Sequence, residues 1–188
     1  MPADWNRIAR RIRVPLGFVF AGVYIWLAQP TFVSMAWSLL LVLPGLWLRG
    51  YAAGYVKKNA ELTMTGPYAY TRNPLYLGSM LIAFGFAAAS KSIVIVLLLA
   101  LLFAVIYVPV IRSEEEFLRS KFADFGTYAM RVPRLVPRLT PAHTVTSSSD
   151  TECGVFSFPL YRKHREYNAL TGATAIYAVL ALRIIFKH

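Results

Sequence analysis

Cysteine and histidine are scarce in this sequence, and their scarcity excludes two kinds of site. Cys153 is the only cysteine, so no internal disulfide is possible, and the three histidines (His143, His164 and His188) are scattered. Zinc sites are usually built from cysteines and histidines at characteristic short spacings. The pattern therefore predicts no metal site and no zinc chemistry.

Acidic residues are also few. The chain has 9 Asp and Glu against 20 Lys and Arg, which gives a formal net charge of +11. Such an excess can mark a surface that binds nucleic acid. Here, however, the basic residues lie beside apolar runs and form no continuous basic face, so we expect no nucleic-acid partner.

Charged residues of either sign make up only 15% of the chain, whereas 57% of it is hydrophobic. This composition is typical of proteins whose solvent is lipid. About 20 helical residues cross the hydrocarbon core of a bilayer. Four uncharged stretches span or nearly span that distance: residues 14–29, 31–48, 73–90 and 92–111. A fifth candidate, residues 167–186, is interrupted only by Arg183, which can snorkel to an interface.

We therefore predict an all-α, polytopic integral membrane protein with four to five transmembrane helices. The distribution of positive charge predicts its orientation. With the N-terminus in the cytoplasm, the basic residues of four segments fall on one side: 7–13, 57–72, 112–138 and 162–165. The positive-inside tendency favours this arrangement. Both long polar segments then face the cytoplasm, where soluble cofactors are available.

The third and fourth apolar runs are joined only by Ser90 and Lys91, which predicts a tight helical hairpin over about residues 73–111. Both ends of such a hairpin emerge on the same side of the membrane. The hairpin therefore brings GPYAYTRNPLY (residues 66–76) next to RSEEEFLRSKF (residues 112–122), although the two segments are distant in the sequence.

The stretch from 66 to 74 is predicted to be a structured loop, because Pro67 and Pro74 exclude a continuous helix and Gly66 favours a turn. Two interpretations of its polar residues remain open. In the first, Asn73 caps the following helix and the other side chains are ordinary interfacial residues. In the second, the loop presents an arginine and tyrosines to a pocket: Tyr68, Tyr70, Arg72 and Tyr76.

Three adjacent glutamates, residues 114–116, follow the fourth run. If the helix continues, Arg112 and Arg119 lie within one turn of them, and a solvated ladder of salt bridges is possible. Neighbouring residues on a helix point about 100° apart. The three carboxylates therefore cannot all face the same way, and we expect at least one to face the loop that carries Arg72.

Prolines recur at every fourth position further on, at Pro133, Pro137 and Pro141. They exclude an ordinary helix interior. We expect an extended strap along the membrane surface, with Arg131, Arg134 and Arg138 able to meet lipid phosphates. A cover over a cofactor pocket would have a similar sequence.

Two motifs that flank the hairpin together resemble the isoprenylcysteine carboxyl methyltransferase family and its relatives, the phospholipid methyltransferases. The first is TGPYAYTRNPLYLG, before the hairpin. The second, after the hairpin, is EEEFLRSKF followed by a tyrosine and VPRLVP. The resemblance covers about residues 40–138. It implies an integral membrane enzyme that uses S-adenosyl-L-methionine, bound in a cytoplasmic pocket between the hairpin and the segment that follows it.

The resemblance places the family's motifs on particular residues. Its Gly-Pro-Tyr motif falls within TGPYAY, and its Arg-His-Pro motif, often Arg-Asn-Pro in bacterial members, falls on RNP. Two overlapping registers of its acidic pair both contain Glu115, and the next motif is one residue shorter here, so Tyr128 is not assigned. The implied cofactor-binding residues are Gly66, Pro67, Tyr68, Arg72, Asn73, Tyr76, Glu114 and Glu115, with Arg72 and Glu115 also in catalytic roles.

The implied function is methyl transfer to a lipophilic acceptor: a small molecule, a lipid or a prenylated terminus. Carboxyl O-methylation of an isoprenylcysteine-like or other lipophilic acid is the first choice, and N-methylation of an ethanolamine-type phospholipid is the enzymatic alternative. A small transporter or assembly subunit is the non-enzymatic alternative. The absence of charge within the first, third and fourth runs disfavours transport. Sterol-type NADPH-dependent membrane reductases resemble this chain in C-terminal architecture, but no further motif supports that function.

The predicted organisation has three parts. A membrane methyltransferase core occupies residues 1–140, and a cytoplasmic linker and basic segment occupies residues 141–166. An additional C-terminal transmembrane or interfacial helix occupies residues 167–188.

Overall fold

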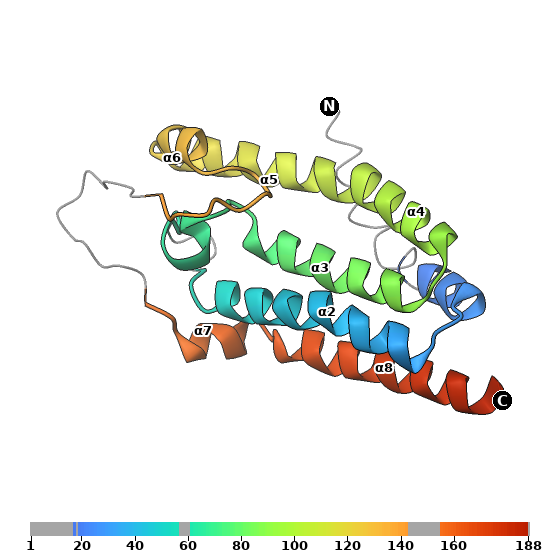
Figure 1. The fold of residues 1–188 in the computed structure, drawn as a ribbon. Coiled ribbons are helices and arrows are strands. Elements are labelled where there is room, and N and C mark those ends of the chain that lie inside the picture. The colour runs from blue at the N-terminus through green and yellow to red at the C-terminus, as the bar shows by residue number, and fades with distance from the viewer. Residues whose placement is uncertain (1–16, 18, 57–60, 143–154, 188) are drawn as a thin grey trace.

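The computed structural model describes residues 17, 19–56, 61–142 and 155–187 (Figure 1). Within these residues the protein is helical and has no β-strand, so the predicted all-α class is confirmed. Residues 19–27 are helical. The elements that follow are α2 (Phe32–Ala53), the 3-10 turn η1 (Gly66–Ala69), α3 (Pro74–Ala89), α4 (Ile93–Leu102), the π-helical segment η2 (Phe103–Tyr107), α5 (Val108–Lys121), α6 (Phe125–Arg131), α7 (Phe158–Lys163) and α8 (Tyr167–Lys187).

Among the described residues, 3 helices are long and apolar enough to cross a membrane: Phe32–Ala53, Ile93–Lys121 and Tyr167–Phe186. α3 is apolar too, but its 16 residues extend only about 24 Å, less than the ~30 Å hydrocarbon core. Large apolar side chains such as Trp37, Trp47 and Leu101 are exposed, as expected of a surface that faces lipid. The polytopic membrane character is therefore confirmed, with α3 as a shorter fourth apolar helix.

The tight hairpin predicted over about residues 73–111 is present. α3 ends at Ala89, and α4 begins at Ile93 after a turn in which Lys91 has a φ of 55°. The second arm continues as one helix of 29 residues through α4, η2 and α5. This helix widens into the π-helical turn just before Pro109. The widening occurs there because proline has no N–H for an α-helical hydrogen bond and its ring crowds the preceding turn. This continuation carries the glutamates beyond the apolar run.

α3 lies between α2 and the α4–α5 helix, and α8 runs along the other side of α2 (Figure 1). α2 and α3 approach closely because Gly45 and Gly78 face each other. A Cβ added at either glycine would lie 2.8 Å from the carbonyl oxygen of the other. This contact sets the depth of α3 and hence the position of the loop before Pro74.

The C-terminal segment packs against α2 rather than standing apart from it. Tyr177 of α8 shares a hydrogen bond of 2.6 Å with Ser38 of α2. Glu166, just before α8, accepts two hydrogen bonds of 3.0 Å from the guanidinium of Arg49. α8 therefore belongs to the same helical bundle.

Some expectations from the sequence lie outside the described residues. These are the basic N-terminal residues 7–13, the lysines at 57 and 58, and most of the predicted linker, at residues 143–154. Of the first apolar run, the structure describes a helix over residues 19–27.

Candidate functional site

The predicted loop between α2 and α3 is present and is built around η1. Gly66 opens η1 with a φ of +58°, and a Cβ added there would lie 2.6 Å from the Tyr55 ring. Pro67 follows at the second position of the turn, and Pro67, Tyr68 and Ala69 are buried. Glycine is the residue that suits both this left-handed conformation and this close contact.

The proline-rich stretch, residues 132–142, contains no helix, as predicted. It crosses the loop as a strap, and the two segments bond through their backbones. Arg72 N donates to Pro133 O at 2.9 Å, and Arg138 N donates to Tyr70 O at 3.0 Å. The strap therefore packs against the loop, and its role as a cover over a cofactor pocket stays a prediction.

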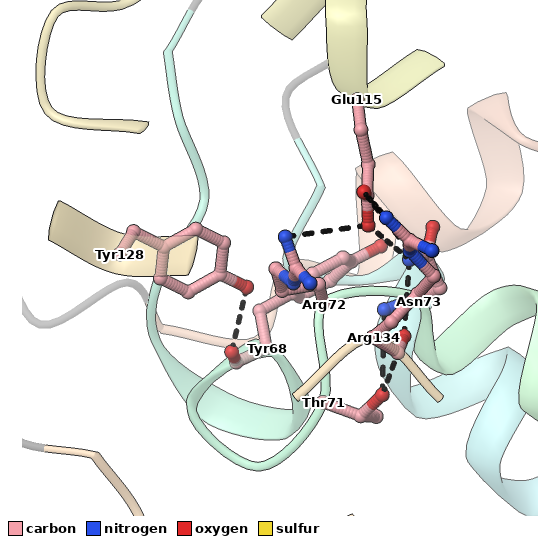
Figure 2. Close-up of polar contacts among 7 residues, drawn as sticks. All are labelled: Tyr68, Thr71, Arg72, Asn73, Glu115, Tyr128 and Arg134. Atoms are coloured by element: carbon pink, nitrogen blue, oxygen red, sulfur yellow. Dashed lines mark hydrogen bonds and ion pairs between the residues drawn. The ribbon is translucent and has the colours of Figure 1, made fainter. Parts of the chain in front are cut away.

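A buried carboxylate joins the loop, α5 and the strap (Figure 2). Glu115 is 8% exposed, and its Oε2 accepts hydrogen bonds from Nε and Nη2 of Arg134 at 3.0 and 2.8 Å. Its Oε1 lies 3.5 Å from Nη1 of Arg72. The prediction that at least one glutamate faces the loop of Arg72 is confirmed. Its neighbours Glu114 and Glu116 are exposed.

Three expectations about these side chains are corrected. Asn73 stands before α3 but makes no side-chain capping bond; its Nδ2 donates to Glu115 Oε1 at 3.3 Å and to Arg134 O at 3.0 Å. Arg134 pairs with Glu115 rather than with lipid, and this hydrogen-bonded carboxylate raises the pKa of the Arg134 guanidinium. Glu115 pairs across the fold instead of along its helix, because a buried charge requires close partners.

Tyr76 and Glu114, two further predicted site residues, also meet. The Tyr76 hydroxyl donates to Glu114 Oε1 at 2.9 Å. The Tyr76 ring packs edge-on against Tyr107, with 5.9 Å between ring centroids. The first turn of α3 is thereby tied to α5 at a second point, beside the Glu115 cluster.

Tyr128 was not assigned from the sequence, yet it supports the site. It is 2% exposed, and its hydroxyl donates to the carbonyl oxygen of Tyr68 at 2.8 Å (Figure 2). Burial raises the pKa of both phenols, Tyr68 and Tyr128. The spacing of Phe125, Tyr128 and Val132, which form a small core together with Ala142, is a helical pattern that would have indicated this buried face.

These elements enclose a cavity of about 590 Å³, here called the site cavity. All the predicted cofactor-binding residues except Gly66 and Pro67 line it: Tyr68, Arg72, Asn73, Tyr76, Glu114 and Glu115. Phe125 and Tyr128 of α6 complete one wall. Arg72 Nε and Thr63 Oγ1 are buried and have no hydrogen-bond partner. Gly66 and Pro67 shape the loop without lining the cavity.

A model of the phospholipid methyltransferase family matches residues 18–124. This chain belongs to that family. The matched region includes the loop, the hairpin and Glu115, and it ends before the strap and α8. The recognition made from the sequence motifs is thereby confirmed.

The chain is also similar to two curated proteins named for metal resistance. The cobalt-zinc-cadmium resistance protein CzcN of Cupriavidus metallidurans is 42% identical over 95 residues, which cover 50% of this chain and 43% of that protein. The nickel-cobalt-cadmium resistance protein NccN of Alcaligenes xylosoxydans xylosoxydans is 39% identical over 108 residues, 57% of this chain and 50% of that protein. The chain thus spans about half the length of these relatives.

No solved structure matches this phospholipid methyltransferase family member. Within the residues that the structure describes, no group of three or more His, Cys, Asp or Glu is placed to hold a metal ion.

Proposed function

We propose that the protein transfers a methyl group from S-adenosyl-L-methionine to a lipophilic acceptor, and that the site cavity is where it does so. Arg72 carries the proposal. Its guanidinium lines the cavity, and its buried Nε has no hydrogen-bond partner. A buried N–H without a partner is rare in folded proteins and is accounted for when a ligand supplies the acceptor. Membership in the phospholipid methyltransferase family supports the same reaction class.

The charge of the cluster fits an anionic group. One carboxylate, Glu115, faces two guanidiniums, those of Arg72 and Arg134, so the cluster has a net positive charge. The carboxylate at the amino acid end of S-adenosyl-L-methionine is an anion that a guanidinium binds well. Glu115 holds the two arginines in place, which makes it a positioning residue in this proposal.

The rest of the cavity fits the other parts of the cofactor. Its volume of about 590 Å³ lies within the range of about 300–1,000 Å³ that is usual for ligand pockets. Glu114 offers a carboxylate to an ammonium or hydroxyl group. Tyr68, Phe117 and Phe125 line the cavity and offer aromatic faces to a flat or cationic group. When bound, the cofactor supplies an electrophilic methyl group on a sulfonium.

A carboxylate acceptor is the simplest substrate class, because it is already unprotonated and needs alignment and desolvation more than acid–base help. We therefore propose an isoprenylcysteine-like or other lipophilic acid. An ethanolamine-type phospholipid is the alternative, and the family's name favours it. An amine acceptor must lose a proton, and Glu114, exposed in the cavity wall, is the group proposed to take it.

Calorimetric titration of the detergent-solubilised protein with S-adenosyl-L-methionine tests the cofactor site. We expect Arg72→Ala to weaken binding about tenfold or more, since a charge-assisted hydrogen bond is lost. Arg112→Ala, which removes an exposed guanidinium of α5 outside the cavity, is the matched control and should bind as the wild type does. Folded wild-type protein that binds no cofactor would contradict the proposal.

Transfer of a labelled methyl group to extracted membrane lipids then separates the two acceptor classes. A methyl ester is hydrolysed by mild base, whereas an N-methyl group is stable to it. We expect base-labile product. Base-stable label in the phospholipid fraction would establish the amine alternative instead.

A further inference from the structure

A second cavity, of about 370 Å³, lies among α2, α3, α4, α8 and the helix of residues 19–27; we call it the apolar cavity. Its wall is built mainly from hydrocarbon groups such as Phe20, Ile82, Leu99 and Ile176. Neither the family motifs nor the proposed cofactor site accounts for it.

The polar side chains in this wall are largely satisfied by the protein itself. The Tyr24 hydroxyl donates to Phe86 O at 2.9 Å. Arg49 is bound by both oxygens of Glu166 and also donates to Ser79 Oγ. Because this guanidinium already has its carboxylate, the cavity does not require an anion. A water molecule would find few of the two to four partners it needs.

The two cavities lie on successive turns of α3. Leu75 lines the site cavity, and Ser79, one helical turn later, lines the apolar cavity. Arg49 spans the boundary, since its Nη1 donates both to Leu75 O, at 3.5 Å, and to Ser79 Oγ. A molecule that filled the apolar cavity would therefore have one end near the first turn of α3, where the site cavity begins.

The medium beside the apolar cavity points to a hydrocarbon occupant. Gly172 and Ile176 of α8 line the cavity and are also exposed, and α8 is one of the helices suited to cross a membrane. The cavity therefore opens toward acyl chains. An apolar cavity of about 150 Å³ suffices to bind benzene, so this larger one has room for an extended chain segment.

We propose that the apolar cavity binds the hydrocarbon chain of the methyl acceptor, with the reactive head group reaching the site cavity past Leu75. The inference rests on the proposed function. Four residues of α8 form one wall: Ala169, Gly172, Ala173 and Ile176. Because α8 lies beyond the residues matched by the family model, this chain's own C-terminal helix sets which chain length is accepted.

Gly172 is the position at which to test this. A Cβ added there would meet no atom within 4 Å, so Gly172→Phe can fill the cavity without breaking existing packing. Thr174→Phe is the matched control, because Thr174 is exposed on the same helix and does not line the cavity. It projects about 200° away from Gly172 around the helix.

The probe is palmitic acid with a diazirine at its chain end. It is photoactivated on the 188-residue chain in lipid nanodiscs, and the labelled peptides are mapped by mass spectrometry. We expect labelling of residues 169–176 or of α3 in the wild type and in Thr174→Phe, and loss of that labelling in Gly172→Phe. Equal labelling in all three proteins, or labelling confined to outward-facing residues such as Leu97, would overturn the proposal.

A methyl-transfer arm separates a bound acceptor from a structural lipid. With labelled S-adenosyl-L-methionine and extracted membrane lipids, Gly172→Phe should shift the labelled products to shorter chains, and Thr174→Phe should not. An unchanged product profile would show that the cavity holds only a structural lipid, which overturns the acceptor assignment. Failure of the proposed function is seen separately, because the wild-type protein would then bind no cofactor. In that case the assignment of the acceptor fails as well. Photolabelling uses no cofactor and still shows whether a hydrocarbon chain binds in the apolar cavity.

Discussion

Glu115 is the residue at which α5, the loop and the strap meet. Its two oxygens contact Arg72, Asn73 and Arg134, and its side chain is 10% exposed. A buried carboxylate in such a cluster contributes little net stability as a pair, but its loss leaves the guanidinium of Arg72, 12% exposed, without a close counter-charge.

Glu115→Gln should therefore affect both stability and binding. It leaves the guanidiniums of Arg72 and Arg134 close together without a counter-charge, so we expect the free energy of unfolding to fall by about 3 kcal/mol. Cofactor affinity should fall with it, because the orientation of Arg72 is lost. Thermal unfolding and calorimetric titration measure the two effects. Glu116→Gln, an exposed neighbour, should change stability by less than about 0.5 kcal/mol; equal effects of the two variants would contradict the assigned role.

Tyr128→Phe removes one hydroxyl and leaves the carbonyl of Tyr68 without its donor. The expected loss of stability is about 1–2 kcal/mol, measured by thermal unfolding. Tyr167→Phe changes an exposed tyrosine and should have no measurable effect. If Tyr128→Phe were as stable as the wild type, the hydrogen bond from Tyr128 to Tyr68 O would contribute nothing to stability.

The same phenol predicts a pH dependence. Burial raises the pKa of Tyr128 above its ordinary value, which is about 10 in the unfolded chain. The folded state therefore keeps the proton when the unfolded state loses it, and stability falls as the pH rises above about 10. This fall should be shallower in Tyr128→Phe; equal slopes in the two proteins would mean that Tyr128 does not cause it.

At the scale of elements, the loop and the strap depend on each other. Most of the loop and of the strap lies outside regular helix, and the two segments satisfy each other through bonds such as Thr71 Oγ1 to Arg134 O, at 3.2 Å. The prolines that exclude helix from the strap also leave its carbonyl groups free to accept from the loop. The site therefore exists only when both segments are in place.

Gly66→Ala tests this dependence. The left-handed backbone and the contact with the Tyr55 ring both disfavour a Cβ, so we expect destabilisation of about 1–2 kcal/mol and faster proteolysis of the loop. Gly126→Ala in α6, where an added Cβ meets nothing within 4 Å, is the control and should be neutral or slightly stabilising. Matching behaviour of the two alanines would contradict the strain argument.

At the scale of the whole molecule, the Arg49–Glu166 ion pair connects the C-terminal helix to the bundle. Arg49 is 25% exposed and Glu166 10% exposed, with a contact of 2.9 Å. Because Arg49 also donates to Leu75 O and Ser79 Oγ, the pair joins α2, α3 and the start of α8. The predicted boundary between a core and a C-terminal part stays a prediction, but the described halves share this contact.

Glu166→Ala should destabilise the protein by about 3 kcal/mol, because it leaves Arg49 largely buried without its carboxylate. Protease release of α8 and thermal unfolding measure the effect. Replacing both partners, as Arg49→Met with Glu166→Leu, removes the uncompensated charge and should recover much of the lost stability. A double variant no more stable than Glu166→Ala would show that the charge is not the cause.

The orientation in the membrane stays a prediction, and the only cysteine of the chain offers a direct test. Cys153 belongs to a segment that the positive charges place in the cytoplasm. A membrane-impermeant maleimide should label it in inverted vesicles and not in intact cells. In a Cys153→Ser background, Lys91→Cys, at the exposed turn of the hairpin, should show the reverse. The opposite pattern would invert the topology and place the site cavity outside the cytoplasm.

The sequence by itself determined the class of the molecule and the main parts of the site. Composition and uncharged runs are sufficient to recognise transmembrane helices. Exposing charged groups or unpaired backbone groups to hydrocarbon costs so much free energy that few other structures can cross the membrane. The short connection through Ser90 and Lys91 between the third and fourth apolar runs likewise requires a hairpin, which brings Arg72 toward Glu115.

Only the tertiary structure decided how the polar side chains pair. Local rules favoured Asn73 as a helix cap, Arg134 bound to lipid phosphate and a ladder of salt bridges along α5. In the structure Asn73 and Arg134 instead contact the buried carboxylate of Glu115. A charge away from water takes the strongest partners that the fold brings within reach. The packing of the strap against the loop and the apolar cavity against α8 were likewise decided by the tertiary structure. They depend on contacts between segments far apart in the chain, which no local pattern encodes.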